Sequence, residues 1–192
     1  MKGMKIKSLI VLAGLCLLFM TSCSEQQKFT KSIKGDWWPV HASGSVDNSI
    51  YSAQWNGDLG EHGEILVSFV FKSDPSKVTK EYVFYPALSF GKDNRNNDAV
   101  RKADISSREI KASKYLQYKV EKGIFYLEKT NENGTPTGEF DEGRPYKFID
   151  ENTLQIGTVT YESYTYYRQT HRNSMTELGD DSGLIPIFVY ED

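Results

Sequence analysis

Extended segments in which apolar and polar side chains alternate with a period of two residues dominate this sequence. Ile65, Val67, Phe69 and Phe71 fall on one face of such a segment, and residues 116–121 repeat the pattern. Turn-forming residues separate the segments at spacings of about 8–12 residues, which is typical of antiparallel sandwiches and barrels. Successive side chains of a strand point to opposite faces, so each segment can bury one face and leave the other in water. The pattern predicts an all-β domain with little helix.

The number of expected strands favours a closed barrel. Aromatic residues make up 13% of the chain, and such residues are enriched in strands. An antiparallel up-and-down barrel of roughly 8–10 strands removes the exposed edges that template aggregation, and its interior has room for one small ligand. The clearest strand signals cover residues 65–71, 78–90, 116–121, 124–129, 145–149, 153–158 and 162–169.

Other segments indicate loops, a short element and an edge. Residues 92–104 and 131–143 are polar and are expected to be long loops outside the barrel. Residues 106–112 begin with a capping-box pattern and fit either a short helix or another strand. The tail over residues 183–190 is apolar, but Pro186 argues against a central strand, so an edge strand or a C-terminal strap is expected.

The first 22 residues are expected to be a signal peptide rather than part of the fold. Lys2, Lys5 and Lys7 precede an apolar run over residues 9–20, which is too short for a membrane span of about 20 residues. The following residues, Met20-Thr21-Ser22-Cys23, resemble the lipobox of bacterial lipoproteins. That resemblance implies cleavage before Cys23 and lipidation of this cysteine. An ordinary secretory signal with a chance cysteine is the alternative.

Lipidation of Cys23 would give the protein a membrane partner and an address. The expected location is the outer membrane, on either its periplasmic side or the cell surface, as in lipoproteins of Bacteroidetes. Residues 23–32 are polar and are expected to form a lipidated tether before the barrel domain of residues 33–192. The net charge of −3 gives no basis for a nucleic-acid partner, because such proteins show a basic patch or stripe.

One motif at the start of the barrel domain points to a family. Gly35-Asp36-Trp37 resembles the G-x-W signature of lipocalins, and the stretch from Tyr146 to Arg168 resembles the closing hairpins of lipocalin-like lipoproteins from Bacteroidetes. The resemblance implies that Arg168 ends the last barrel strand and packs over Trp37. Such a pair would close the barrel structurally, since a guanidinium can lie flat on an indole. Trp38 must then point to the opposite face of the strand.

Catalytic and metal-binding signals are weak. The three histidines lack zinc-site spacing. Asp58, Glu61, His62 and Glu64 form one dense polar cluster, interpreted as a hairpin loop before the strand at Ile65. Residues 93–98 resemble a calcium loop but lack its glycine and its closing glutamate. We therefore predict no catalytic residue, no metal site and no cofactor.

Three functions remain open. The first is non-catalytic binding of a small hydrophobic or glycan-like ligand inside the barrel, at residues that the sequence does not identify. The alternative is an accessory or interaction module of an envelope complex, with a filled barrel and a protein partner. A hydrolase is the third. A cavity of about 300 Å³ or more favours the ligand, whereas a filled core with an exposed aromatic patch favours the protein partner.

Overall fold

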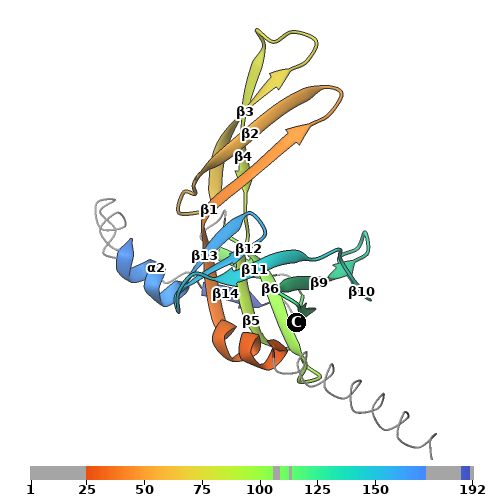
Figure 1. Ribbon diagram of the computed structural model, residues 1–192, viewed down its shortest axis with the longest axis vertical. Coiled ribbons are helices and arrows are strands. Elements are labelled where there is room, and N and C mark those ends of the chain that lie inside the picture. The colour runs from red at the N-terminus through yellow and green to blue at the C-terminus, as the bar shows by residue number, and fades with distance from the viewer. Residues whose placement is uncertain (1–24, 106–108, 113, 172–186, 191–192) are drawn as a thin grey trace, which may run out of the picture.

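The computed structural model describes residues 25–105, 109–112, 114–171 and 187–190, which form a barrel with a long arm on one side (Figure 1). The strands in the first half of the chain are β1(Gly35–Asp47), β2(Tyr51–Asp58), β3(Glu64–Phe71), β4(Val78–Phe84), β5(Ala87–Lys92), β6(Asp98–Asp104) and β7(Glu109–Ala112). Those in the second half are β8(Leu116–Glu121), β9(Ile124–Thr130), β10(Pro136–Phe140), β11(Arg144–Phe148), β12(Thr153–Ile156), β13(Val159–Ser163) and β14(Ile187–Tyr190). Helices within the described ranges cover residues 25–33 and α2(Tyr164–Thr170).

Eight antiparallel strands close into a ring. β1 pairs with β5, β5 with β6, β6 with β8, and β8 with β9, and the ring continues through β11, β12 and β13 back to β1. The ring strands follow one another in chain order, which is the up-and-down topology of a lipocalin-like barrel. The expected fold class is confirmed, and closure leaves the ring itself without an open edge.

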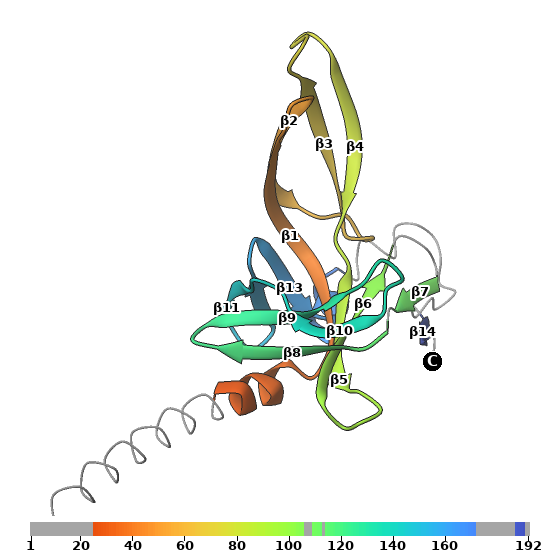
Figure 2. The same cartoon turned by 90° about the vertical axis from the view of Figure 1, so that its right-hand side faces the viewer.

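β1 connects the arm to the barrel, because its first part belongs to the ring and its second part to the arm. Residues 35–42 of β1 pair with β5 or β13 in the ring, whereas residues 41–47 pair with β2. A register shift between Pro39 and His41 marks the place where the strand leaves the barrel, as bulges commonly do. β2, β3 and β4 complete the arm, and β4 runs back along it toward β5 (Figure 2).

The segment expected to be a polar tether is instead a helix over residues 25–33, called the cap helix below. Phe29 and Ile33 lie four residues apart, so they share one face of the helix, and both are almost fully buried. The Phe29 ring contacts the rings of Phe90, Tyr118, Phe125, Tyr146 and Phe148, with centroids 4.7–6.2 Å apart. The cap helix therefore plugs one end of the barrel, and the tether prediction is wrong for the described residues 25–32.

Both expected long loops are mostly hairpins. Residues 98–104 form β6, which pairs with β5 over residues 98–103, and residues 136–140 form β10 on the edge of β9. The polarity of the sequence did not reveal β6 as a strand, because its buried side chains include small ones, such as Ala99 and Ala103, and a charged one, Arg101. The Arg101 guanidinium is covered by Tyr115, whose ring centroid lies 3.8 Å away.

β7, β14 and α2 occupy the three other segments for which the sequence made a prediction. Residues 109–112 form strand β7, so the strand alternative holds for that part of the segment. β14 pairs in parallel with β7 at the end of the strand order, which confirms an edge strand in the tail. The strand expected over residues 162–169 is wrong beyond Ser163, because α2 begins at Tyr164.

Candidate functional site

The barrel interior is filled by side chains from the ring strands and from the cap helix. Burial raises the pKa of Tyr118 to about 12, as it does for Tyr146 at the plugged end. Both hydroxyls therefore keep their protons at neutral pH. The buried cluster consists of Phe29, Ile33, Trp37, Leu88, Phe90, Val100, Leu116, Tyr118, Val120, Phe125, Leu127, Leu154, Ile156 and Tyr161.

Trp37 closes the barrel, but not with Arg168. The Trp37 indole nitrogen donates a 2.8 Å hydrogen bond to the carbonyl of Ile33 in the cap helix, and its ring packs against Phe148 inside the barrel. Arg168 lies on α2, on the opposite side of β1, with its guanidinium carbon 5.9 Å from the ring centroid of Tyr164. The expected pairing is wrong because the chain turns into a helix before Arg168. The cap helix covers Trp37 instead.

Trp38 points away from the interior, as expected, and anchors α2 to the barrel wall. Its ring stacks on Tyr167 with centroids 5.6 Å apart and contacts Tyr164 at 5.2 Å. Its indole nitrogen donates to the carbonyl of Glu61 in the loop between β2 and β3. Trp38 thus joins the barrel, α2 and the foot of the arm.

The cap helix is fixed to the barrel by polar contacts at its first turn. The Glu25 carboxylate accepts hydrogen bonds from the amides of Lys122 and Gly123, each at 2.8 Å, and from the Tyr146 hydroxyl at 3.0 Å. These donors, the Gly123 amide first, hold the pKa of Glu25 below its ordinary value. Gln26 accepts from the amide of Val120 at 2.8 Å. Cys23, the expected lipidation site, lies outside the described residues, two positions before this clamp.

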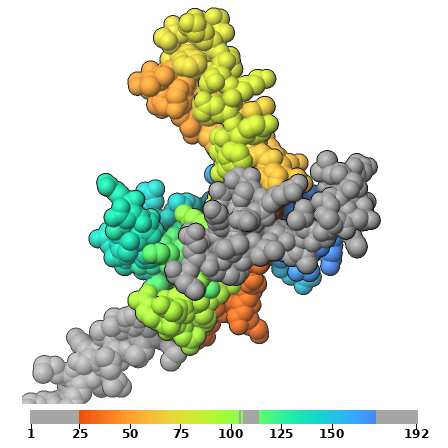
Figure 3. Space-filling model, turned by 180° about the vertical axis from the view of Figure 1, so that it is seen from behind, coloured from red at the N-terminus to blue at the C-terminus, as the bar shows by residue number. Residues whose placement is uncertain are grey.

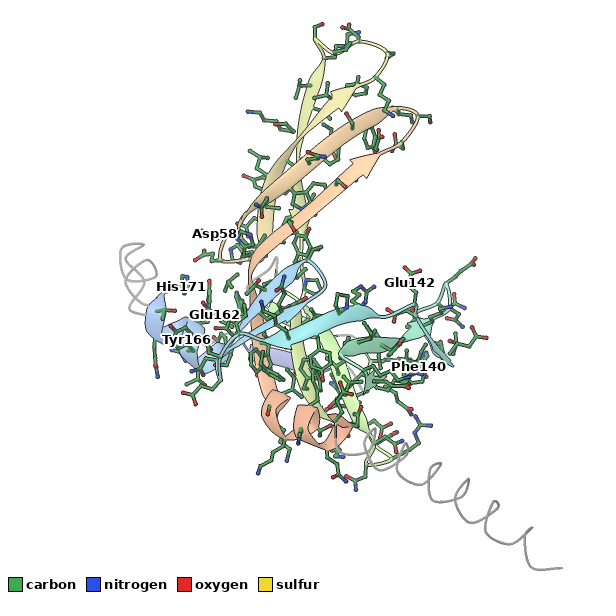
Figure 4. All side chains as sticks on the ribbon, viewed as in Figure 1. Asp58, Phe140, Glu142, Glu162, Tyr166 and His171 are labelled. Atoms are coloured by element: carbon green, nitrogen blue, oxygen red, sulfur yellow. The ribbon has the colours of Figure 1, made fainter. Side chains whose placement is uncertain are left out.

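Two surface hollows, each of about 250 Å³, lie in the described part of the protein. One lies beside the cap helix between Glu25 and Phe148. The other, the waist hollow, lies where the foot of the arm, β13 and α2 meet, and Figure 4 shows Asp58, Glu162 and His171 around it. Val40, His41, Leu59 and Tyr167 complete its lining.

Titratable groups of the waist hollow have shifted pKa values. His41 donates to Asp58 and to Asn56, each at 2.9 Å, and the bond to Asp58 is the main cause of its raised pKa. Burial raises the pKa of Glu162, whose Oε2 is buried without a hydrogen-bond partner. Among the described residues, no group of three His, Cys, Asp or Glu side chains is arranged to hold a metal ion. The waist hollow therefore brings together two groups, His41 and Glu162, whose charge responds to pH.

The sequence-level metal candidates are occupied by structural hydrogen bonds. Glu64 accepts from the amide of His62 at 2.9 Å in the turn between β2 and β3, the loop expected there. Asp93 accepts from the amides of Arg95 and Asn97 at 2.9 and 2.8 Å, which shapes the hairpin between β5 and β6. Side chains used in this way organise turns.

The arm buries one face of each of its strands. Val67 and Phe69 of β3 pack against Ala53 of β2, and Trp55 donates a 2.8 Å hydrogen bond to the Tyr85 hydroxyl. These contacts form a separate small core, completed by Val46, Tyr51, Ile65 and Val83. The arm is therefore a packed structure and not a loose hairpin.

The opposite face of β3 and β4 is apolar and open to solvent. Leu66 pairs with Tyr82 across the two strands, and their exposed fractions are 50% and 59%. Val78 and Phe84 of β4 are also about half exposed, at 51% and 52%. The outer face, as it is called below, comprises Glu64, Leu66, Ser68 and Val70 of β3 and Val78, Lys80, Tyr82 and Phe84 of β4, so three polar side chains lie among its apolar ones. Figure 3 shows β3 and β4, in yellow to yellow-green, standing clear of the barrel.

The outer face is the strongest candidate for function, and the sequence analysis missed it. Alternation identified Ile65, Val67 and Phe69 as one apolar face, but Leu66 and Tyr82 make the other face apolar as well. Large exposed apolar patches mark interaction surfaces on soluble domains. A signal was present in β4, where Tyr82, Val83 and Phe84 interrupt the alternation.

Comparison with family models, with curated proteins and with solved structures gave no match. No helix within the described ranges is long and apolar enough to cross a membrane. The assignment of function therefore rests on the geometry of the barrel, the waist hollow and the arm.

Proposed function

We propose that this protein is a lipid-anchored docking module of the bacterial envelope, which binds a protein partner through the outer face of its arm. The observation that carries the proposal is the exposure of Leu66, Tyr82 and Phe84 on a well-packed arm. Aromatic side chains offer large apolar surface with few rotatable bonds, and they dominate the energetics of protein interfaces.

The filled interior favours this function over a small-ligand carrier. Ligand sites of drug size are concave and measure about 300–1,000 Å³. Phe29 and Trp37 occupy the plugged end of the barrel, and the rings of Tyr118 and Phe125 stack at 5.6 Å against each other while both contact Phe29. The two hollows lie outside this core.

The cap helix, which follows the proposed anchor in the chain, and the arm with the proposed binding surface lie at opposite ends of the described structure (Figure 1). Glu25 clamps the start of the cap helix to the turn between β8 and β9, so lipids on Cys23 would hold the plugged end of the barrel near the membrane. The arm then projects away from the bilayer. This arrangement suits a module that presents a surface to another envelope protein.

The anchor is tested with Cys23→Ala expressed in the native host. Loss of lipidation is expected to move the protein from the membrane fraction to the soluble fraction. The acyl chains would no longer bury their methylene groups in the bilayer, and these groups supply the free energy of anchoring. A Cys16→Ala variant is the matched control and is expected to stay in the membrane. Persistent membrane partition of Cys23→Ala at high salt would contradict the lipoprotein assignment.

The docking surface is tested by placing a photo-crosslinking phenylalanine analogue at Tyr82 in intact cells. We expect one protein, identified by mass spectrometry, to be captured from Tyr82 and lost when Leu66 and Phe84 are both changed to Ser. The analogue at Ile149, which is similarly exposed but lies on the barrel, is the control position. Equal capture from Tyr82 and Ile149, or capture that survives the double change, would overturn the proposal.

A further inference from the structure

Among the described strands, β4 is an open edge as well as part of an exposed face. In the order of the sheet it is the terminal strand, with β3 as its neighbour. It pairs with β3 over Val78 to Phe84 without a register shift, and it contains neither proline nor glycine. Natural proteins usually shorten, bend, cover or charge such edges because they template strand pairing, and in β4 only the last of these devices is present, at Lys80 and Glu81. β10 shows such protection, with Pro136 and a register shift.

The hydrogen-bonding pattern shows which backbone groups face the open edge. The amide of Tyr85 donates to the carbonyl of Gly63, and the amide of Phe71 donates to the carbonyl of Lys77, so odd-numbered positions bond toward β3. Residues along an antiparallel pair alternate between facing the partner and facing away. The amides and carbonyls of the even-numbered residues therefore point outward. These residues are Val78, Lys80, Tyr82 and Phe84, the same ones whose side chains lie on the outer face.

Two exposed charges of opposite sign lie next to each other in β4. Lys80 lies between Val78 and Tyr82 on the outer face, whereas Glu81 belongs to the opposite face of the strand. Neighbouring cations of the arm are paired within the described structure, Lys72 with Asp47 and Lys77 with Asp74, whereas Lys80 forms no ion pair there. A strand lying beside β4 would place its side chains opposite these residues, where an acidic group meets Lys80 and apolar groups meet Val78 and Tyr82.

We propose that β4 binds an extended segment of the partner protein by strand addition, and that this segment carries an acidic side chain flanked by apolar ones at alternate positions. The inference rests on the proposed docking function and specifies its partner. Backbone hydrogen bonds supply affinity in this mode, while alternate side chains supply specificity. A second copy fits less well. Antiparallel pairing of two β4 edges would turn the two barrels in opposite directions, whereas the proposed anchors hold them in one membrane.

The probe for this inference is a soluble nine-residue peptide of alternating valine and threonine with glutamate at its centre, labelled with a fluorophore. Binding to the purified protein is followed by fluorescence anisotropy. One matched peptide carries lysine at its centre. Two others carry N-methyl groups on alternate amides, one on each of the two alternating sets. We expect the glutamate peptide to bind at least tenfold more tightly than the lysine peptide, and the peptide whose methylated amides face β4 to lose binding.

Three substitutions of Lys80 separate the contribution of its charge to peptide binding from the contribution of its backbone amide. Lys80→Ala is expected to weaken the glutamate peptide a few-fold, and Lys80→Glu is expected to reverse the preference between the two peptides. Lys80→Pro removes an outward-facing amide without breaking the ladder to β3, as prolines on edge strands do, and is expected to abolish binding of both. Circular dichroism and thermal unfolding verify that the Pro variant keeps its fold.

Each contrary result has a defined meaning. Equal affinity of Lys80→Pro and Lys80→Ala for the glutamate peptide, or undiminished binding of the N-methylated peptides, would overturn strand addition. A wild-type dimer that Lys80→Pro makes monomeric in analytical ultracentrifugation, without peptide binding, would assign the edge to a second copy and overturn the inference. Failure of the peptide together with specific capture from Tyr82 in cells would reject this inference and leave the docking function standing. Failure of both would reject both.

Discussion

The hydroxyl of Tyr146 donates to the carboxylate of Glu25 across 121 residues of sequence, at 3.0 Å. This bond ties the first turn of the cap helix to β11, and the ring of the same tyrosine lies 4.7 Å from that of Phe29. One residue of the barrel wall thus holds both the polar and the apolar side of the plug. The stability of the barrel should therefore depend on a segment of nine residues that has few apolar side chains of its own.

Phe29→Ala is expected to lower the free energy of unfolding by about 3–5 kcal/mol, as for other buried aromatic side chains. The cost arises because five neighbouring rings lose a common partner and a cavity remains. Urea unfolding followed by tryptophan fluorescence measures it. Lys28→Ala changes an exposed neighbour on the same helix and should cost less than about 0.5 kcal/mol. A loss below 1 kcal/mol for Phe29→Ala would show that the cap helix is not part of the cooperative core.

Glu25→Gln tests the clamp through pH. The pKa of Glu25 is lowered in the fold, so its contribution to stability is present above the unfolded value of 4.5 and is lost as the pH falls through the lower, folded pKa. Wild type should be more stable than the variant near pH 7, and the difference should shrink as the pH falls below 4.5. Thermal unfolding across pH 3–7.5 gives both curves. A difference that is constant with pH would contradict an ionised clamp.

Glu162→Gln should have the opposite effect. Burial raises the pKa of Glu162, so the folded state binds a proton more readily than the unfolded chain does, and stability declines as the pH rises above 4.5 through the folded pKa. Removing the charge should raise the melting temperature at pH 7.5 and flatten its dependence on pH between about 4.5 and 7. Glu151→Gln, at an exposed position, is the control. A lower melting temperature for Glu162→Gln at pH 7.5 would contradict this reading of the waist hollow.

Asp58→Asn should return the pKa of His41 toward 6.5. The bond to Asp58 raises that pKa in the wild type, and an amide oxygen offers weaker support to the charged imidazole. The titration of the histidine ring protons by NMR measures the shift directly, and His62 provides an internal reference. An unchanged His41 titration in the variant would mean that the pair does not form in solution.

Much of the barrel follows from local alternation. β8 and β9 were predicted within one residue because Leu116, Tyr118 and Val120 face the core and their neighbours face water. The cap helix was missed because only Phe29 and Ile33 mark its buried face, and their four-residue spacing is a weak signal in a polar segment. α2 was missed for another reason, since its tyrosines favour strands locally. Packing of Tyr164 and Tyr167 on Trp38 outweighs that preference.

The candidate site was harder to predict than the fold. A pattern of residues identifies which side chains can be buried, but not which of two apolar faces of the β3–β4 hairpin finds a partner within the chain. Trp55 and Ala53 cover one face only after β2 folds back along the arm, a contact that local sequence does not encode. Leu66, Tyr82 and Phe84 therefore became visible as a surface only in three dimensions.

The continuity of β1 has a mechanical consequence. β1 runs without a break from the arm into the ring. A partner that pulls on the arm would therefore transmit tension to the barrel through the covalent backbone of this strand and not through non-covalent contacts between two domains. Residues 35–37 pair with β5 and residues 37–42 pair with β13, and a pull along β1 would load the hydrogen bonds of both pairings in shear. If lipids hold Cys23, the same path continues through Trp37 and the cap helix to the membrane. In that case the fold would transmit tension from a partner bound to the arm to the bilayer.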